Sequence, residues 1–531
     1  MKLRAAVIVD NLNIARWQEE ALIAASEEIE IVMLINCQNT SIKRNYFKNF
    51  LYYLLNIFSL RNHLTKTHKI RNSAELVINF DSIYEGIWQL FPLSIYESLR
   101  KEKIDVVIKF GMNLLRIDED KLSAPILSYH HGDPSNYRGR PAGFYEILNG
   151  EKMVGIIVQV LCNKLDAGKI LTFASSKVVN YSYKKTAINL YSNSKYLLKK
   201  ALVNLSSNQY IQHEVNGKNY RLPSNLKVFH FSLLLLKNSF SKIFYGLFYE
   251  KIWRVAVSKH QLSLKNNEMI DSSNLEEIPL LDKYTFYADP FFSIDGRYIR
   301  FEALNSKTGL GNIVEASSSN FLQQRELLSG QHFSYPYSFI FQDKEYLLPE
   351  EASHSSQSIY CLNPEVKKIS SLKGLEGKKV IDATLFFKDD CYFLFFGEEP
   401  HPASVLNLWY SEDSPVGIFY PHPMNPIVVN PSIARMGGKI AFISDKLVRF
   451  GQNNSGEYGE SLAILEIVKL TKEAYEERQI GEIKIEDFKG PHTLNLDPCQ
   501  NRIIIDYYTN QFSFLAGIRR IKAKLKASKF I

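Results

Sequence analysis

Short apolar runs alternate with helix-like stretches over the first 110 residues. The runs AAVIV at 5–9, IEIVMLI at 29–35 and IDVVIKF at 104–110 have the length and composition of buried strands. Buried strands separated by helices are typical of a parallel sheet that is covered on both faces. The pattern therefore predicts a Rossmann-like α/β domain over residues 1–205. No GxGxxG follows the first strand, so dinucleotide binding is not predicted.

Two aromatic, apolar segments predict further helices. Residues 46–60 predict a helix packed on the sheet, with a lipid-facing helix as the alternative. Residues 226–253 combine LLLL and FYGLFY with single lysines, which is the pattern of an amphipathic helix or helix pair. We expect residues 206–275 to form a helical connector between two domains, and docking of this segment on a membrane surface is the alternative.

From residue 284 onward the chain repeats one outline: an apolar strand, a turn rich in Gly, Asp or Asn, and a second aromatic or apolar strand. Five segments share it: 288–302, 334–351, 382–399, 430–445 and 492–508. The first four begin 46 to 48 residues apart, measured between Pro290, Pro336, Ala383 and Pro431. Hairpins repeated at this period are the signature of β-propeller blades. The sequence predicts a five-bladed propeller over residues 276–515, followed by a basic tail at 516–531.

Charge and cysteine content narrow the function classes. The net charge is 64 − 56 = +8, but six basic residues and no acid lie in the last 13 positions, so the body is near neutral. We therefore expect no nucleic-acid partner. Five scattered cysteines, and an N-terminal apolar run too short for a signal peptide, indicate a cytoplasmic protein. The basic tail suits peripheral contact with the inner face of a membrane.

The most specific local signal lies in residues 126–171. Its elements are His130, Tyr137-Arg138-Gly139, Asn149-Gly150-Glu151, Gly155 and Asp166-Ala167-Gly168. In order and spacing they resemble the folate-dependent formyltransferases that act on methionyl-tRNA and on amino sugars. The resemblance covers about residues 1–200 and implies 10-formyltetrahydrofolate as cofactor.

The resemblance also implies roles for individual residues. His130 would be the acid/base and Asp166 its partner, with Tyr137 and Arg138 at the substrate. The turn containing Phe110, Gly111 and Asn113 would contact the cofactor. Such a reaction needs a hydrogen-bond donor for the developing oxyanion. The family's Asn is replaced here by Ser128, and Asn113 is the candidate substitute.

A second constellation lies in the repeats. Strands of a propeller blade bring polar residues to one axial pocket, so acids at the strand ends are expected to gather there. The candidates are Asp289, Tyr335, Asp382, either Asn430 or Arg435, and His492 at the first strands, and Glu302, Glu350, Glu351, Glu398, Glu399 and Asp445 at the second. A carboxylate beside apolar strands is costly unless it is paired or hydrated. Acids that merely cap strands at a solvated rim are the alternative.

The segment ADPF at 288–291 resembles the first blade of five-bladed arabinanase-like glycoside hydrolases. That resemblance implies Asp289 as general base, Glu350 or Glu351 as general acid and Asp382 as a supporting carboxylate. Tyr335 stands where those hydrolases carry another Asp. Through YADPFF, SYPYSF, DATLFF and GPHTLNLD, residues 284–508 resemble still more closely the propeller region of the glucosamine inositolphosphorylceramide transferase family.

Three functions remain open. The first is N-formyl transfer to an amino sugar, with the propeller binding the glycan. The second is glycosyl transfer or glycoside hydrolysis at the propeller axis, and the third is a non-catalytic assembly module for surface glycans. All three imply a sugar or nucleotide-sugar partner, free or lipid-linked, in surface polysaccharide, lipopolysaccharide or glycolipid biosynthesis. No loop has the spacing of a calcium site, so no metal is predicted.

Overall fold

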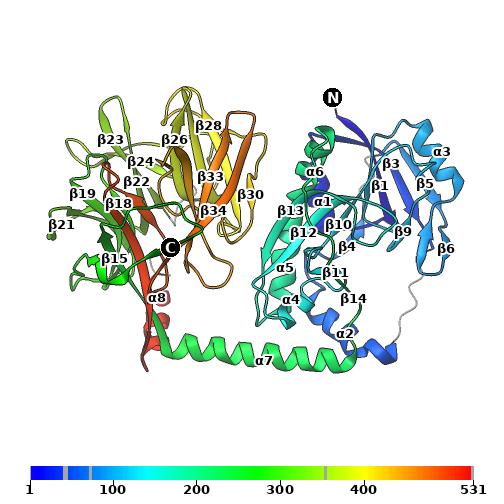
Figure 1. The fold of residues 1–531 in the computed structure, drawn as a ribbon, viewed down its shortest axis with the longest axis horizontal. Coiled ribbons are helices and arrows are strands. Elements are labelled where there is room, and N and C mark those ends of the chain that lie inside the picture. Colours follow the sequence, from blue (N-terminus) through cyan, green and yellow to red (C-terminus); the bar gives the residue numbers. More distant parts are fainter. Residues whose placement is uncertain (1, 40–45, 71–73, 352–355, 528–531) are drawn as a thin grey trace. The chain divides into compact units, whose positions relative to one another are not determined.

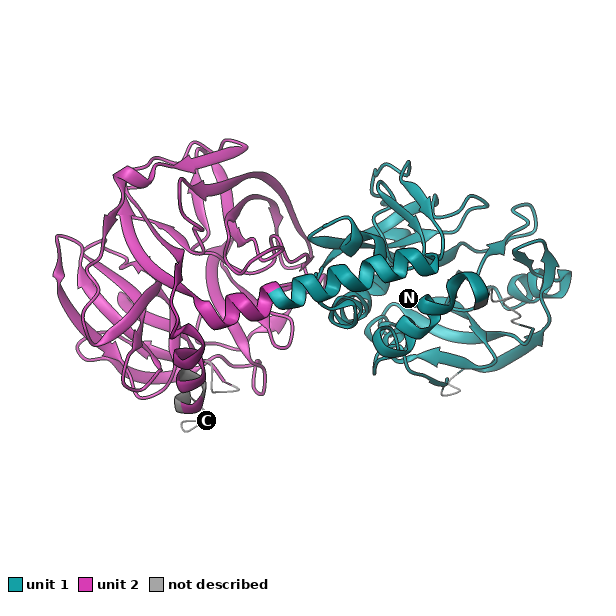
Figure 2. Cartoon of the chain, turned by 90° about the horizontal axis from the view of Figure 1, so that it is seen from below, with its two compact units in different colours: residues 1–240 teal, residues 241–531 magenta. Residues whose placement is uncertain are grey.

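The chain divides into two units, residues 1–240 and 241–531 (Figure 2). The computed structural model describes residues 2–39, 46–70, 74–351 and 356–527. Unit 1 mixes helices and strands, whereas unit 2 consists almost entirely of strands (Figure 1). No helix in these described ranges is both long and apolar enough to serve as a membrane span.

Unit 1 is built around a nine-stranded sheet. Its strands are β1 (Leu3–Asp10), β2 (Asn13–Ala15), β3 (Ile29–Cys37), β4 (Thr67–Lys69), β5 (Leu76–Phe80), β8 (Val106–Lys109), β10 (Ile126–His130), β12 (Met153–Val160) and β13 (Lys169–Lys177). Short strands outside it are β6 (Ile83–Glu85), β7 (Trp88–Leu90), β9 (Leu115–Arg116), β11 (Tyr137–Gly139) and β14 (Lys218–Tyr220). The predicted strands at 5–9, 29–35 and 104–110 are confirmed as β1, β3 and β8.

Five neighbouring strands of this sheet are parallel, in the order β5-β3-β1-β8-β10. The chain runs from β1 outward through β3 to β5 and then returns to the other side of β1 as β8. This reversal places a topological switch point between β1 and β8. In open α/β sheets, ligands bind outside the carboxyl ends of the strands at such a point.

Helices complete unit 1. They are α1 (Arg16–Ala24), α2 (Tyr46–Ser59), α3 (Leu93–Lys101), α4 (Phe144–Leu148), α5 (Tyr183–Ser194) and α6 (Leu197–Ser206). The helix expected at 46–60 exists as α2, but the expectation that its apolar side covers the sheet is wrong. Phe47, Phe50 and Phe58 are exposed, and α2 contacts α5 instead.

A 24-residue helix, α7 (Asn225–Phe248), begins in unit 1 and ends in unit 2. The amphipathic pattern of 226–253 predicted a helix through Trp253, but the helix ends five residues earlier. Trp253 lies instead in β15 (Tyr249–Ser258), because this segment pairs with β36 (Ile503–Phe512) along its whole length. Pairing with residues some 250 positions away is invisible to a local helical period.

Within the residues that the structure describes, unit 2 forms five sheets of four or five strands, whose strands pair antiparallel except at one edge. The first three sheets are β18 (Tyr284–Phe292) to β21, β22 (Phe333–Phe341) to β25, and β26 (Val380–Lys388) to β30. Their further strands are β19 (Tyr298–Asn305), β20 (Gly311–Ser317), β21 (Asn320–Leu328), β23 (Lys344–Glu351), β24 (Ser358–Cys361), β25 (Lys367–Ser371), β27 (Cys391–Glu398), β28 (Val405–Ser411), β29 (Tyr420–Pro421) and β30 (Val428–Val429).

The last two sheets combine distant parts of the chain. One contains β16 (Asn267–Ile270), β31 (Ala441–Ile443), β32 (Lys446–Gln452), β33 (Leu462–Leu470) and β34 (Tyr475–Ile485). The other contains β15, β17 (Glu276–Glu277), β35 (Leu494–Leu496) and β36, so it joins the beginning of unit 2 to its end. The helix α8 (Ala516–Ala527) follows β36, and residues 528–531 of the predicted basic tail lie outside the described residues.

Four of the five predicted hairpins are present, and the fourth segment differs. Residues 430–445 were expected to form a hairpin around Gly437 and Gly438. Instead, residues 431–440 run as turns and bends, and the hairpin of that sheet turns at Ser444 and Asp445. This irregular stretch releases Arg435 from a strand, and its side chain reaches Asp382.

Candidate functional site

In three successive sheets, the strand that comes first along the chain is interrupted by a bulge at the same place. The register skips after Ala288 in β18, after Ser334 in β22 and after Ile381 in β26. The next residues, Asp289, Tyr335 and Asp382, have φ angles of 51°, 46° and 52°. A left-handed backbone costs a non-glycine residue on the order of 1–3 kcal/mol, and such strain concentrates at functional sites. Bulges also redirect side chains, so we infer that this repeated position is the functional one.

The first polar group surrounds His492. Its Nδ1 lies 3.1 Å from Oδ2 of Asp506 and 3.3 Å from Oδ1 of Asp289. Asp506 is fully buried and also accepts the backbone N–H groups of Asp289, His492 and Thr493. Because both carboxylates only accept hydrogen bonds, Nδ1 of His492 carries a proton. The other nitrogen, Nε2, lies 2.8 Å from the hydroxyl of Tyr458.

Burial alone lowers the pKa of His492, but Tyr458 and the carboxylates of Asp506 and Asp289 outweigh it and raise the pKa well above its usual range. The ring is therefore an imidazolium at neutral pH. The hydroxyl of Thr493 donates to Asp289 at 3.0 Å, so the imidazolium and this hydroxyl contact the same carboxyl group.

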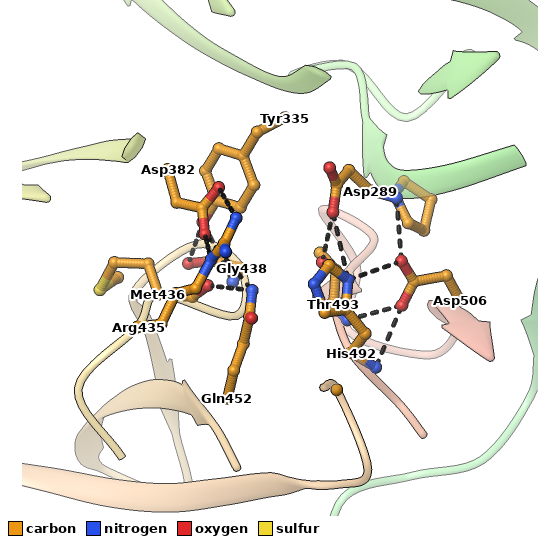
Figure 3. Close-up of polar contacts among 12 residues, drawn as sticks. Asp289, Tyr335, Asp382, Arg435, Met436, Gly438, Gln452, His492, Thr493 and Asp506 are labelled. Carbon is orange, nitrogen blue, oxygen red and sulfur yellow. Dashed lines mark hydrogen bonds and ion pairs between the residues drawn. The ribbon is translucent and has the colours of Figure 1, made fainter. Parts of the chain in front are cut away.

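The second polar group surrounds Asp382. Arg435 contacts both of its oxygens, with Nε at 2.5 Å and Nη2 at 3.3 Å, which is a bidentate pair. The amide of Gln452 lies 3.4 Å from the same carboxylate. Figure 3 shows this group facing the His492 group. Tyr458 links the two polar groups. Its hydroxyl contacts His492, and its ring centroid lies 5.3 Å from the guanidinium carbon of Arg435.

Two further acids, Glu302 and Glu350, have raised pKa values, which favours their neutral form. Burial, followed by the charges of Asp289 and Glu350, raises the pKa of Glu302 well above its usual range. Burial and the charge of Asp382 do the same to the pKa of Glu350, against the opposing effect of Arg435. The backbone N–H of Asp382 donates to Glu350 at 3.3 Å. Two acids with raised pKa values therefore share one site with the charge-paired Asp289 and Asp382.

This arrangement can carry acid/base chemistry. When neighbouring groups push the pKa values of two acids apart, the neutral one can donate a proton while the ionised one accepts one. Glu350 is only half-buried, so it can meet a substrate, and it comes from the second sheet. Asp289 comes from the first sheet and Asp382 from the third.

The two candidate acids, Glu350 and Glu351, have different surroundings. Glu351 accepts hydrogen bonds from Ser358 at 3.2 Å and Tyr360 at 2.9 Å, because neighbouring side chains of a strand point to opposite faces. Its carboxylate therefore lies outside the cluster. Tyr335 is fully buried, and its hydroxyl contacts Thr384 and Gly438. It therefore supports the site structurally and is not available to a substrate.

Several members of the cluster were not predicted. They are His332, Gln452, Tyr458, Thr493 and Asp506. Asp506 could have been predicted from the sequence, because it is the single acid in the apolar run IIIDYY and a buried acid must be paired. Tyr458 left none, because it lies in the loop between β32 and β33.

Three atoms in this cluster also have the spacing of metal ligands. Asp289, His492 and Asp506 bring one ligand atom each within 4.8 Å of one another. The hydrogen bonds of Asp506 and a protonated His492 account for this spacing without an ion.

Unit 1 gathers the predicted formyltransferase-like residues at the carboxyl ends of β1, β8 and β10. Nδ1 of His130 lies 3.4 Å from Oδ1 of Asp166, and Nε2 contacts the carbonyl oxygen of Tyr137 at 3.0 Å. The other oxygen of Asp166 accepts the N–H of Gly139 at 2.8 Å. Both nitrogens of His130 thus face acceptors within the fold.

Ser128 is buried and lies opposite Lys109 in the register of β10 and β8. Burial lowers the pKa of Lys109 to about 8, while Asp10 and Asp166 oppose the shift. This amine is therefore a cation beside the position of the missing Asn.

The remaining predicted residues of unit 1 are largely engaged within the fold. Tyr137 donates to Glu151 at 2.8 Å, and Nε of Arg138 donates to the carbonyl of Gly217 at 2.9 Å. Phe110 packs against Trp17 and Tyr129. Gly111 lies so close to Asp10 that a Cβ at this position would stand 2.7 Å from the Asp10 carboxyl oxygen. Asn113 is exposed.

Comparisons with solved structures return formyltransferases. Glycinamide ribonucleotide transformylase 1 from Symbiobacterium toebii is 11% identical with a TM-score of 0.29, covering 42% of this chain and 94% of that one. Phosphoribosylglycinamide formyltransferase from Anaplasma phagocytophilum is 16% identical with a TM-score of 0.28, covering 41% and 97%.

Residues 273–496 match the family described as glucosamine inositolphosphorylceramide transferase 1, N-terminal. The rice (Oryza sativa subsp. japonica) protein of that name is 31% identical over 217 residues, or 38% of this chain. The Arabidopsis thaliana protein is 31% identical over 227 residues, or 40% of this chain. The chain spans only 29% of the length of each relative. Over this part of unit 2, the chain is thus similar to the N-terminal region of glucosamine inositolphosphorylceramide transferases.

Proposed function

We propose that this protein acts on carbohydrate in glycolipid or surface-polysaccharide assembly, through glycosidic-bond chemistry at the acid cluster of unit 2. The observation that carries the proposal is the gathering, from different sheets, of Asp289, which pairs with His492, and Glu350, whose pKa is raised. Glycosidic-bond cleavage uses such a pair, one carboxyl to protonate the leaving oxygen and one to activate the attacking group.

The five sheets are best interpreted as the blades of a five-bladed propeller. Polar contacts join neighbouring sheets: Asp289 of β18 contacts Asp506 of β36, and Asp382 of β26 contacts Arg435, which precedes β31. The pairing of β15 with β36 would close the ring, because it joins the first and last parts of unit 2. In such a ring the bulged positions lie near the axis.

Within this site the residues have distinct roles. Asp289, paired with the protonated ring of His492, is the general base, and Glu350 is the general acid. The charge of Asp382 raises the pKa of Glu350, and Arg435 orients Asp382 by contacting both of its oxygens. Glu302 and His332, whose contact is 3.6 Å, bind sugar hydroxyl groups.

The relatives' name suggests the substrate class. Amino sugars and lipids with an inositol phosphate headgroup are therefore the first substrates to test, as nucleotide-sugar donors and glycolipid acceptors. Because only the N-terminal region of the relatives is matched, their activity can also reside in the unmatched part. A glycan-binding module without turnover is the outcome expected in that case.

The test is turnover and binding measured together. We expect the protein to release or transfer sugar from one member of a panel of nucleotide sugars and glycolipids, detected by mass spectrometry. Asp289→Asn should reduce turnover about a hundredfold and leave glycan binding intact. Binding is measured by the fluorescence of Trp253, because its ring centroid lies 5.1 Å from that of His492. Binding without turnover in the unmodified protein would show a binding module, and neither binding nor turnover would refute the proposal.

N-formyl transfer in unit 1 is the second candidate, and the contact between His130 and Asp166 favours it. If it operates, the protein binds 10-formyltetrahydrofolate and releases tetrahydrofolate with an amino sugar. Ser128→Asn should then raise the rate by on the order of a hundredfold, because it restores an oxyanion donor. Asp166→Asn is the matched control and should abolish the reaction. Absence of folate binding by calorimetry would exclude this candidate.

A further inference from the structure

The helix α7 exposes a continuous apolar stripe. Seven large side chains recur at spacings of three and four residues, which places them on one face of a helix. They are Leu226, Phe229, Leu233, Leu236, Phe240, Ile243 and Leu247, each between 47% and 78% exposed. Large exposed apolar surfaces on soluble proteins mark interaction sites.

Two more helices present apolar side chains beside the ends of α7. Next to its start, α2 exposes Phe47, Phe50, Leu54, Ile57 and Phe58. Next to its end, α8 and the turn before it expose Phe514, Leu515, Ile518, Ile521 and Leu525. Exposed apolar rows thus occur on three helices rather than along one narrow seam.

Specific contacts attach both helices to α7 (Figure 1). The N–H of Leu51 in α2 donates to the side chain of Asn225 at 3.0 Å, and Asn225 donates to the carbonyl of Phe47 at 2.8 Å. Arg520 in α8 donates to the carbonyl oxygens of Gly246 and Tyr249. The exposed rows therefore belong to folded, anchored helices.

The charge of these helices has one sign. Together they contain Lys48, Lys227, Lys237, Lys242, Arg519, Arg520, Lys522, Lys524 and Lys526, and their sequences contain no Asp or Glu. Apolar rows accompanied only by cations are the pattern of helices that lie in the interface of an anionic membrane. A second copy of the chain would bring like charges together with no acid on these helices to pair them.

We propose that the exposed apolar stripe of α7, here called the basic apolar surface, docks on an anionic lipid bilayer, and that the exposed rows of α2 in unit 1 and of α8 in unit 2 are further lipid contacts of each unit by itself. The apolar side chains enter the region between headgroups and acyl chains, and the lysines of α7 contact lipid phosphates, whereas Arg519 pairs with Glu250 at 2.9 Å and Arg520 holds α8 on the chain. This surface is independent of the acid cluster, so it can operate whatever reaction unit 2 performs.

Co-sedimentation of the full chain with vesicles tests this proposal. We expect binding to phosphatidylcholine vesicles that contain phosphatidylglycerol, weak binding to phosphatidylcholine alone, and release by high salt. The double variant Leu233→Ser, Leu236→Ser should lose most of the binding. Lys237→Gln should weaken it roughly fivefold, the equivalent of about 1 kcal/mol per charge at the surface.

Matched controls use exposed side chains elsewhere in unit 2. The double variant Ile340→Ser, Ile369→Ser removes two apolar side chains that are 54% and 47% exposed and should bind vesicles normally. Light scattering of the free protein supplies the second measurement. Equal vesicle binding by the α7 double variant and the unmodified protein would overturn the proposal. So would a dimer that the α7 substitutions convert to a monomer, because the surface would then be a contact between copies.

Discussion

Replacing Glu350 by Gln is expected to reduce turnover by about 10² to 10⁴, the usual contribution of a general acid. The variant keeps the shape of the side chain but cannot deliver a proton to the leaving oxygen. Its neighbour provides a matched control, because Glu351 has the same chemistry and faces Ser358 and Tyr360 instead. Glu351→Gln should therefore retain most of the activity. The comparison is made by kcat on the substrate identified for the unmodified protein.

The pH profile and the leaving group sharpen this test. Because the pKa of Glu350 is raised, activity should persist at neutral pH and fall when pH rises through that pKa. The Gln variant should lose this alkaline limb. If the reaction is hydrolysis, a substrate whose leaving group needs no protonation should restore much of its rate. Equal losses in the two variants, or an alkaline limb that survives in Glu350→Gln, would contradict the assignment.

Replacing Glu302 by Gln is expected to make unit 2 more stable at neutral pH. The folded-state pKa of Glu302 is raised, so its contribution to stability is full below the unfolded value near 4.5 and is lost as pH rises through the folded value. The free energy of unfolding thus falls by about 1.4 kcal/mol per pH unit across that window. Gln does not titrate, so the variant should lack this fall and be more stable than the unmodified protein above the window.

Urea unfolding at several pH values, followed by hydrogen exchange in unit 2 peptides, measures this effect. His492 also has a raised pKa, so its contribution declines in the same direction and leaves a residual slope in the variant. Glu351→Gln again serves as the control, and it should bring no gain because Glu351 is hydrogen-bonded in the fold. A loss of stability in Glu302→Gln would show that Glu302 is a structural acid. A gain would mean that an acid is retained at a cost to stability, as expected for a functional residue.

The sequence predicts much of this site because acids inside apolar strands are costly. Asp289, Glu302, Glu350 and Asp382 each stand out in this way, and the period of the repeats indicates that they meet. The partners are harder to predict. Tyr458 comes from a loop without a pattern, and the pairing of His492 with Asp506 depends on the turn between two strands of one sheet.

The helices also show what a local sequence pattern does not predict. Their apolar periods predict α2 and α7, but a period does not reveal whether its apolar face is covered. The end of α7 was missed because the aromatic pattern continues past Phe248 into a strand. That strand is fixed by its pairing with β36, which is a non-local interaction.

We propose that one carbohydrate site lies where the bulged strands of unit 2 bring their acids together. Crystals soaked with the amino sugar or glycan that gives the strongest binding test this proposal directly. We expect the sugar in contact with Asp289 and Glu350, within reach of Arg435. A sugar bound elsewhere, with the hydrogen bonds among Asp289, His492 and Asp506 closed to ligand, would contradict it.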